Sequence, residues 1–240
     1  MARKDTKRLQ LTDQLVSAEL RRVAPAVAQL TGWHLGLESL GCRVLPKVRG
    51  YEEILLGRLD EIGIHDRQDL LPGFLERMLE FLIEQNTLAA YLPGSGEILV
   101  IRENVDDSNL DGLRLVLAHE LVHRGQHLVH GRLFARLEEL LRQAFAQIQS
   151  GNPDLGQVRR IMGEIQPIMT LLESHAAYVQ AQLKQARFPQ ARIESDFNLG
   201  TLLMRLVGAG KIAQYSDGLP QVSAAAASGR IDSLYAGFGA

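Results

Sequence analysis

Apolar side chains recur along most of this chain at the three- and four-residue spacing of an amphipathic helix. The pattern is interrupted at Gly131, Pro153 and Pro189, where a helix is expected to end. The spacing and these interruptions predict helices over residues 9–30, 70–85, 113–130, 133–149, 154–186, 195–209 and 220–228. Most of the protein is therefore expected to be helical.

One stretch departs from the helical period. Two short apolar runs, 88–92 and 98–101, flank the turn sequence Pro-Gly-Ser-Gly at 93–96. Such runs around a turn predict a β-hairpin, and this is the only strand signal in the chain. No internal repeat or Pro/Ser-rich linker divides the sequence. The predicted fold class is α+β, predominantly α, with residues 1–240 as a single domain and a small β-hairpin or sheet before the helix that begins near Asp111.

The charges of the chain are nearly balanced. There are 26 lysines and arginines against 28 aspartates and glutamates, which gives a formal net charge of −2. A chain with this balance has no overall attraction to nucleic acid, and the arginine pairs at 21–22 and 159–160 fit solvated helix faces. The basic residues near the start are expected to belong to a flexible tail, 1–8. No nucleic-acid partner is predicted.

The sequence also bears on the compartment. It contains no run of about 18 apolar residues, so no membrane span is predicted. The segment that follows the basic tail is interrupted by polar side chains. It therefore lacks the continuous apolar region of a secretory signal peptide. Cys42 is the single cysteine, so no internal disulfide can form, and its neighbours favour a packed thiol over a nucleophile. These features predict a cytoplasmic protein.

The strongest chemical signal is the pentapeptide 119–123, which reads His-Glu-Leu-Val-His. On a helix, residues four apart differ by about 40° in azimuth and about 6 Å in height, so both imidazoles can reach one metal ion. Neutral imidazole is a preferred ligand of Zn²⁺. Glu120 lies too far round the helix to be a ligand, but it can accept the proton of a water molecule beside the metal. The motif predicts zinc at His119 and His123, with Glu120 as the general base.

The motif is unlikely to arise by chance. A chain of this length and composition would contain about 0.01 such matches if positions were independent. Apolar residues surround it, at Val116, Leu117, Ala118, Leu121 and Val122. The helix is therefore expected to be largely buried, where histidines and a carboxylate require partners.

Two more histidines follow the motif. His127 lies four residues after His123, but no carboxylate stands between them, and it is interpreted as structural. His130 lies next to a glycine and is interpreted as a cap or cation at a helix end. Gln126 and Val129 occupy the positions at which a metzincin has its glycine and third histidine, which excludes that class.

A third ligand must come from another segment. The predicted helix 154–186 offers Glu173 and His175, whose side chains point about 200° apart, so only one can face the metal. Apolar residues surround Glu173, whereas a solvated glutamate would lie on a polar stripe. Glu173 is the favoured ligand, and His175 or a carboxylate elsewhere is the alternative. Small side chains at Ala176 and Ala177 would let the two helices approach closely.

Three blocks of the sequence are similar to those of a known family. They are 115–123, 171–176 and a late block with Gly208, Lys211 and 214–218. Through these blocks, and over most of its length, the chain resembles uncharacterised zincin-like proteins of bacteria that are regarded as zinc-dependent hydrolases or metalloproteases. The resemblance implies a zincin-like metalloprotease fold of the gluzincin type. It also implies Glu173 as the third zinc ligand, Glu120 as the base, and a peptide or protein substrate.

The resemblance leaves other roles to be assigned. Tyr178, His175 and Tyr215 are candidates for the catalytic group that stabilises the oxyanion, and Tyr215 lies in the late block. Many zincins bind extended substrate along a sheet edge, and by that analogy Glu97–Ile101 would supply the edge. Ala177 cannot act as the carboxylate that orients the histidines in some gluzincins, so another residue must do so.

Arg124 is a departure from protease signatures, which have an uncharged residue directly after the second histidine. The departure bears on peptidase activity more than on zinc binding. A second hypothesis is therefore a zincin scaffold that binds zinc and serves as an interaction protein.

Overall fold

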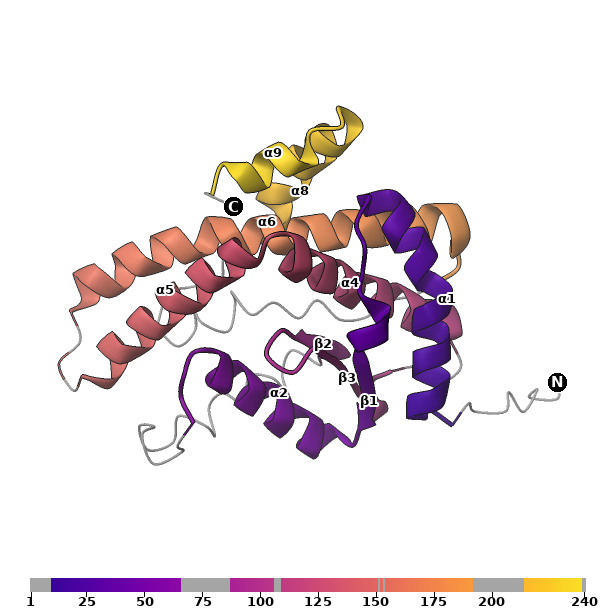
Figure 1. The fold of residues 1–240 in the computed structure, drawn as a ribbon, viewed down its shortest axis with the longest axis horizontal. Coiled ribbons are helices and arrows are strands. Elements are labelled where there is room, and N and C mark those ends of the chain that lie inside the picture. The colour runs from indigo at the N-terminus through magenta and orange to yellow at the C-terminus, as the bar shows by residue number, and fades with distance from the viewer. Residues whose placement is uncertain are drawn as a thin grey trace, which may run out of the picture.

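The computed structural model describes residues 10–65, 87–105, 109–150, 152, 154–191 and 214–238, with all side chains in these ranges except those of residues 148 and 214–217. Most of these residues are helical, and a small three-stranded sheet accompanies the helices (Figure 1). The elements are α1 (Asp13–Thr31), β1 (Gly41–Leu45), α2 (Lys47–Glu61), β2 (Ala89–Leu92), β3 (Glu97–Ile101), α4 (Leu110–Val129), α5 (Gly131–Gln149), α6 (Leu155–Arg187), α8 (Gln214–Ala227) and α9 (Ile231–Ala236), with short 3₁₀ turns at Leu37–Ser39 and Arg102–Asn104. The predicted fold class, α+β and predominantly α, is confirmed.

Side-chain caps explain where the main helices begin. Thr12 accepts a hydrogen bond from the Leu15 amide at the start of α1, and Asn109 does the same for Gly112 in α4. Asp154 accepts hydrogen bonds from two amides in the first turn of α6. Such caps satisfy amides that have no partner within the helix. The predicted helices 9–30, 113–130, 133–149 and 154–186 agree with α1, α4, α5 and α6. The predicted helices 70–85 and 195–209 and the predicted tail 1–8 lie outside the described residues.

His130 joins α4 to α5. Its amide donates to the Gln126 carbonyl at the end of α4, and α5 begins directly afterwards at Gly131. The prediction that His130 caps a helix is confirmed. Burial lowers the pKa of its imidazole, an effect that Asp232 only partly opposes, and this disfavours the alternative that it acts there as a cation. The ring instead stacks on Tyr235.

The sheet has the strand order β1-β3-β2. The predicted hairpin is confirmed, since β2 pairs antiparallel with β3 and Tyr91 lies opposite Ile98. The third strand, β1, was not predicted, and it pairs in parallel with β3. The expectation that Glu97–Ile101 forms a sheet edge is wrong, because β3 is the central strand and is paired on both sides.

Arg43 ties β1 to its neighbours. Its guanidinium donates to both carboxylate oxygens of Glu97 on β3, over 3.0 and 2.9 Å, and pairs with Glu53 of α2. Cys42 precedes it and is partly buried against the core. Burial, followed by the charges of Asp13 and Glu97, raises the pKa of the Cys42 thiol to about 12. A neutral, packed thiol is what the sequence indicated.

The elements stack in layers that place α4 at the centre. Helix α2 packs against the sheet, α4 lies along β2, α6 packs on α4, and α8 packs on α6 (Figure 1). The predicted helix 220–228 corresponds to α8, which begins earlier, at Gln214. Helix α4 buries most of its length, including Leu115, Leu117 and Leu121. The motif therefore lies in the middle of the molecule, between the sheet and α6.

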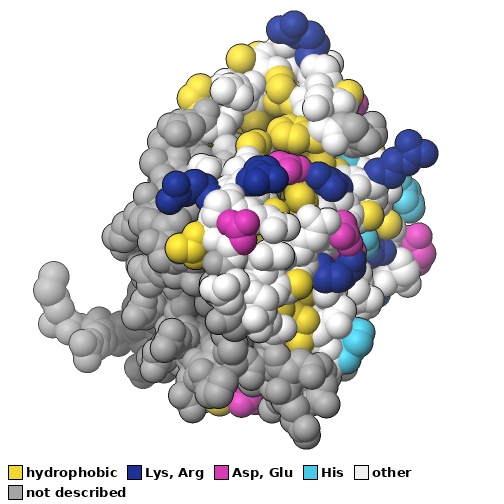
Figure 2. All heavy atoms as spheres, turned by 90° about the vertical axis from the view of Figure 1, so that its left-hand side faces the viewer, with side chains coloured by type: hydrophobic (Ala, Val, Ile, Leu, Met, Phe, Trp, Pro, Cys, Tyr) yellow, Lys and Arg dark blue, Asp and Glu magenta, His cyan; other side chains and the backbone are white. Residues whose placement is uncertain are grey.

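The surface near the α5–α6 turn carries charges of both signs. Figure 2 shows basic and acidic side chains interspersed on the face that lies at the left of Figure 1. Two ion pairs involve α5: Arg136 pairs with Glu164 of α6, and Arg142 pairs with Glu139. Within the described part of the chain, no helix combines the length and apolar character needed to cross a membrane.

Candidate metal centre

The two histidines of the motif lie together on one face of α4. The ring centroids of His119 and His123 are 4.8 Å apart, with the planes at 75°. Their side chains keep 15% and 16% of their surface exposed, so both are mostly buried but can be reached by solvent. The helical spacing therefore brings the two imidazoles together as predicted.

Glu173 approaches this pair from α6. Its Oε2 lies 3.3 Å from His119 Nε2 and 3.7 Å from His123 Nε2. Ala176, one turn further along α6, is fully buried and allows the close packing of α6 on α4. Of the two candidates on α6, Glu173 is the one that the fold brings to the histidines.

The three side chains suit a zinc ion. Bonds of about 2.0–2.1 Å to a tetrahedral ion place neighbouring ligand atoms about 3.3 Å apart, close to the separations from Glu173 to the two imidazoles. The ligand atoms of His119, His123 and Glu173 all lie within 4.8 Å of one another. Two imidazoles and one carboxylate are also a donor set that zinc accepts. The residues present therefore fit Zn²⁺.

The charges of the histidines and of Glu173 influence one another's protonation. Burial by itself would lower the pKa of His123, but the Glu173 carboxylate outweighs burial and raises the pKa to about 9. Burial would likewise raise the pKa of Glu173, but the two imidazoles hold it well below its usual value. The opposite shifts in the two pKa values mean that the Glu173 carboxylate and the His123 imidazole each favour the charged form of the other.

Glu120 lies beside the cluster without joining it. Its Oε2 accepts a hydrogen bond of 2.7 Å from the Tyr91 amide of β2, and the residue is 8% exposed. In the register of the hairpin, the amide and carbonyl of Tyr91 point away from β3. The carboxylate thus satisfies an amide at the outer side of the sheet and is held in one position. The predicted general base is thus tied to β2 by one hydrogen bond and is not among the three side chains whose ligand atoms cluster.

Arg58 of α2 approaches the same residue of β2. Its Nη2 donates to the Tyr91 carbonyl over 2.7 Å, and its Nη1 pairs with Glu61 over 2.9 Å. Burial opposes its charge, but Glu61, Glu120 and Glu173 together raise the pKa of the guanidinium. Arg58 therefore places a positive charge near the carboxylates of the site. Nothing in the sequence pattern singled it out, because α2 and β2 are distant in the chain.

Gln126 contacts one of the predicted ligands. Its Oε1 lies 2.8 Å from His123 Nδ1, and its Nε2 donates to the Leu172 carbonyl and to the Tyr235 hydroxyl. The side chain is completely buried. This is the residue that sequence reasoning required but did not find. A polar residue three positions after His123, on an otherwise apolar helix, was the available signal.

The three predicted oxyanion donors occupy different surroundings. His175 is 2% exposed, and its Nδ1 lies 2.7 Å from the Tyr235 hydroxyl, at hydrogen-bond distance. Burial, together with the charges of His130 and His123, lowers the pKa of His175 to about 4. Tyr178 is partly buried and packs against the core. Tyr215 lies in α8, but its side chain is outside the described residues.

Arg124 points away from the ligand cluster and into the fold. Its guanidinium donates to the Tyr91 hydroxyl over 3.0 Å and to the Ser39 hydroxyl over 2.8 Å. The same Tyr91 hydroxyl lies 2.9 Å from His127 Nδ1. Arg124 therefore ties the segment before β1 to α4, and His127 has the structural surroundings that the sequence indicated.

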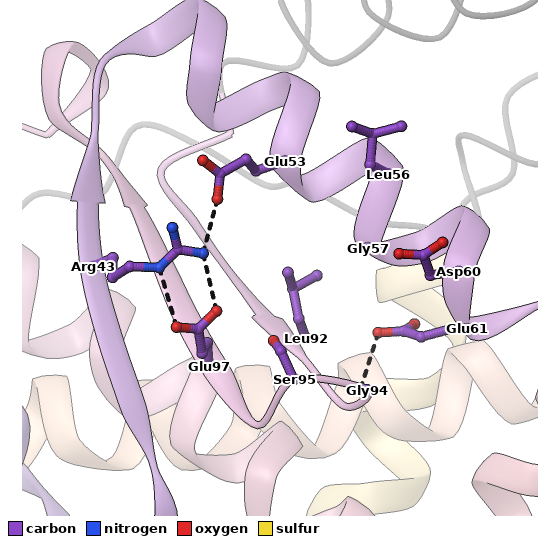
Figure 3. Close-up of a pocket in the computed structure, with 10 residues that line it drawn as sticks. All are labelled: Arg43, Glu53, Leu56, Gly57, Asp60, Glu61, Leu92, Gly94, Ser95 and Glu97. Atoms are coloured by element: carbon purple, nitrogen blue, oxygen red, sulfur yellow. Dashed lines mark hydrogen bonds and ion pairs between the residues drawn. The ribbon is translucent and has the colours of Figure 1, made fainter. Parts of the chain in front are cut away.

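A pocket of about 440 Å³ lies between α2 and the β2–β3 turn (Figure 3). Figure 3 shows Arg43 held between Glu53 and Glu97 at one side, and Glu61 directed toward Gly94 at the other. The pocket contains none of the predicted ligands. Its lining residues are Arg43, Glu53, Leu56, Gly57, Asp60, Glu61, Leu92, Gly94, Ser95 and Glu97.

Comparison of the chain with protein-family models, with curated proteins and with solved structures found no match. The assignment of the site therefore depends on its own geometry.

Proposed function

We propose that this chain is a Zn²⁺-dependent hydrolase with a zincin-like fold that cleaves peptide bonds. His119, His123 and Glu173 would bind the metal, and Glu120 would act as the general base. One observation carries the proposal. The two imidazoles of α4 and the Glu173 carboxylate of α6 lie about as close to one another as the ligand atoms of one zinc ion would. The Glu120 carboxylate, which is bonded to the sheet, lies beside them. A peptide or protein is the proposed substrate.

The chemistry follows from the arrangement of the chain's own groups. Zn²⁺, when bound here, supplies a Lewis acid that polarises a carbonyl group and increases the acidity of water. Glu120 takes the proton of the attacking water and returns it to the leaving amine. The hydrogen bond from the Tyr91 amide to Oε2 holds this carboxylate next to the ligands and leaves Oε1 to carry the proton.

The negative charge that develops on the substrate needs a nearby donor. Tyr178 and Tyr215 remain proposals for this role. His175 is less suited, because its ring is buried and its Nδ1 is engaged by Tyr235. Arg58 offers positive charge close to Glu120 and would lower the energy of a developing oxyanion.

The test combines metal analysis with a peptide-cleavage screen. Purified wild type should contain stoichiometric zinc, and His119→Ala should lose it. Glu120→Gln should keep zinc but reduce cleavage by about 10²–10⁴-fold, because the base is removed while the ligands remain. Glu139→Gln, the same change at an exposed position of α5, serves as the matched control and should behave as wild type. A wild type that carries no zinc would refute the proposal.

A zinc-stabilised interaction scaffold is the second candidate. One observation favours this candidate. The amide and carbonyl of Tyr91, which point away from β3, are already bonded to Glu120 and Arg58. Those groups are then not available to pair with an extended substrate. If the wild type bound stoichiometric zinc but showed no peptide cleavage beyond that of Glu120→Gln, the result would support the scaffold over the hydrolase.

A further inference from the structure

The C-terminal helix α9 buries one side chain deeply. Among the described residues of α9, Tyr235 is the buried one, and its side chain is 0% exposed. Its ring stacks on His130, with centroids 3.9 Å apart and planes at 2°. Trp33, which follows α1, meets the ring edge-on at 6.0 Å. A six-residue helix thus inserts an aromatic ring between the segment that follows α1 and the end of α4.

The hydroxyl of this ring reaches toward the metal centre. It lies 2.9 Å from Gln126 Nε2 of α4 and 2.7 Å from His175 Nδ1 of α6. Gln126 in turn contacts His123 Nδ1 through its Oε1, at 2.8 Å. Tyr235 is therefore two hydrogen bonds away from a predicted zinc ligand.

The Leu172 carbonyl fixes the directions of these hydrogen bonds. The Leu172 carbonyl can only accept, so the atom of Gln126 that lies 2.8 Å from it must be the amide nitrogen. The second hydrogen of that nitrogen points to the Tyr235 oxygen. The amide oxygen of Gln126 then faces His123 Nδ1, which must carry a hydrogen.

The rest of the chain of bonds is consistent with this assignment. The Tyr235 oxygen accepts from Gln126 and donates its own hydrogen to His175 Nδ1, so each of these donors meets an acceptor. With its hydrogen on Nδ1, His123 presents Nε2 toward Glu173. This is the tautomer and the orientation that metal binding requires.

We propose that Gln126 and Tyr235 are positioning residues of the metal centre. By docking Tyr235 onto Gln126, α9 holds His123 in its zinc-binding tautomer and orientation, so that zinc affinity and docking of the C-terminal helix are coupled. This inference rests on zinc binding at His119, His123 and Glu173, which is part of the proposed function, and it does not depend on hydrolysis. The coupling is reciprocal, so zinc should also strengthen the docking of α9.

The first test measures the zinc dissociation constant by competition with a chromophoric chelator. Gln126→Met removes the acceptor of His123 and should weaken zinc binding by about 10–100-fold. Gln126→Glu keeps an acceptor at that position and should bind zinc more tightly than Gln126→Met. Tyr235→Phe keeps the stacked ring and removes only the hydroxyl, which should weaken binding by about 2–10-fold.

Tyr51→Phe is the matched control. Tyr51 is also buried, and its hydroxyl accepts a hydrogen bond from Asn104 in a different part of the fold. This variant loses a buried hydroxyl, as Tyr235→Phe does, but should keep the wild-type zinc affinity. Equal affinity in wild type, Gln126→Met and Tyr235→Phe would overturn the coupling while zinc binding itself stood. A wild type without zinc affinity would overturn both proposals.

The second test follows the reverse direction of the coupling. Hydrogen exchange of the amides of residues 231–236 should slow when Zn²⁺ is added to the full-length wild type. The same addition should have little effect on these amides in Gln126→Met. Exchange in α9 that does not respond to zinc in the wild type would contradict the inference.

Discussion

Helix α4 carries polar side chains on faces that are otherwise apolar, and each has a particular partner. Glu120 is held by the Tyr91 amide, Gln126 by the Leu172 carbonyl, and Arg124 by the Ser39 hydroxyl. A buried polar group left without a partner costs about 1–3 kcal/mol, so these bonds orient the helix about its axis. The sequence showed which residues were polar, but their partners come from segments far away in the chain.

The His123–Glu173 pair makes the stability of the metal-free protein depend on pH. The pKa of His123 is raised from 6.5 to about 9, so its contribution is complete below pH 6.5 and is lost as the pH rises through about 9. The pKa of Glu173 is lowered from 4.5, so its contribution is complete above pH 4.5 and is lost as the pH falls. The pair should stabilise the metal-free fold most between these two values, pH 4.5 and 6.5.

Urea unfolding of metal-free wild type and Glu173→Gln checks this prediction. The difference between their free energies of unfolding should be largest near pH 6 and should shrink toward about pH 9.5, where His123 becomes neutral. Glu139→Gln, which lies on the surface of α5, controls for general effects of removing a charge. A difference that stays constant over this range would show that the ion pair does not form.

At the scale of elements, the four longest helices were predicted, whereas α2, α9 and part of the sheet were not. Local spacing and capping residues were enough for α1, α4, α5 and α6, because a helix satisfies its hydrogen bonds within one segment. The strand β1 depends on Glu97 and Glu53, which hold Arg43 from two other elements. Its five residues alternate poorly between apolar and polar, so no local pattern revealed it.

Gly125 lets the loop after α1 approach α4. A Cβ atom at this position would lie 2.7 Å from the Trp33 ring and 3.2 Å from Leu35. Because the indole is rigid, Gly125→Ala should lower the free energy of unfolding by about 1–3 kcal/mol, as overpacking does. Urea denaturation at equilibrium measures this effect.

Gly163 of α6 provides the comparison for the same substitution. It is exposed, and a Cβ atom there would meet nothing within 4 Å. Gly163→Ala should therefore stabilise the protein by about 0.5–1 kcal/mol through helix propensity alone. If Gly125→Ala and Gly163→Ala changed the free energy of unfolding in the same direction, the close packing of Trp33 on α4 would not explain the effect of Gly125→Ala.

At the scale of the whole molecule, the candidate metal centre brings together side chains from elements that are far apart in the sequence. His119 and His123 belong to α4 and Glu173 to α6, while Tyr235 brings α9 to the same place. A ligand that binds only the folded state stabilises it by about 2.7 kcal/mol at a hundred times its dissociation constant. Zinc should therefore act on the stability of the complete fold.

Thermal unfolding with and without a chelator tests this expectation. Removal of zinc should lower the Tm of the wild type by several degrees, since about 1 kcal/mol corresponds to about 2–4 °C in a chain of this size. His119→Ala lacks a ligand, so its Tm should be the same with and without the chelator. A wild-type Tm that did not respond to the chelator would contradict a zinc site that spans α4 and α6.

The sequence by itself determined α1, α4, α5 and α6, most of α8, the hairpin and the convergence of His119 and His123, but it did not reveal α2 or α9. These features depend on the geometry of one continuous segment, which the spacing of residues reveals. The sequence favoured Glu173 but left His175 open, and the tertiary structure decided between them. It alone decided that β3 is central in the sheet and that Gln126 and Tyr235 lie behind His123. These features require segments far apart in the chain to meet, and their contacts depend on packing that no local pattern encodes.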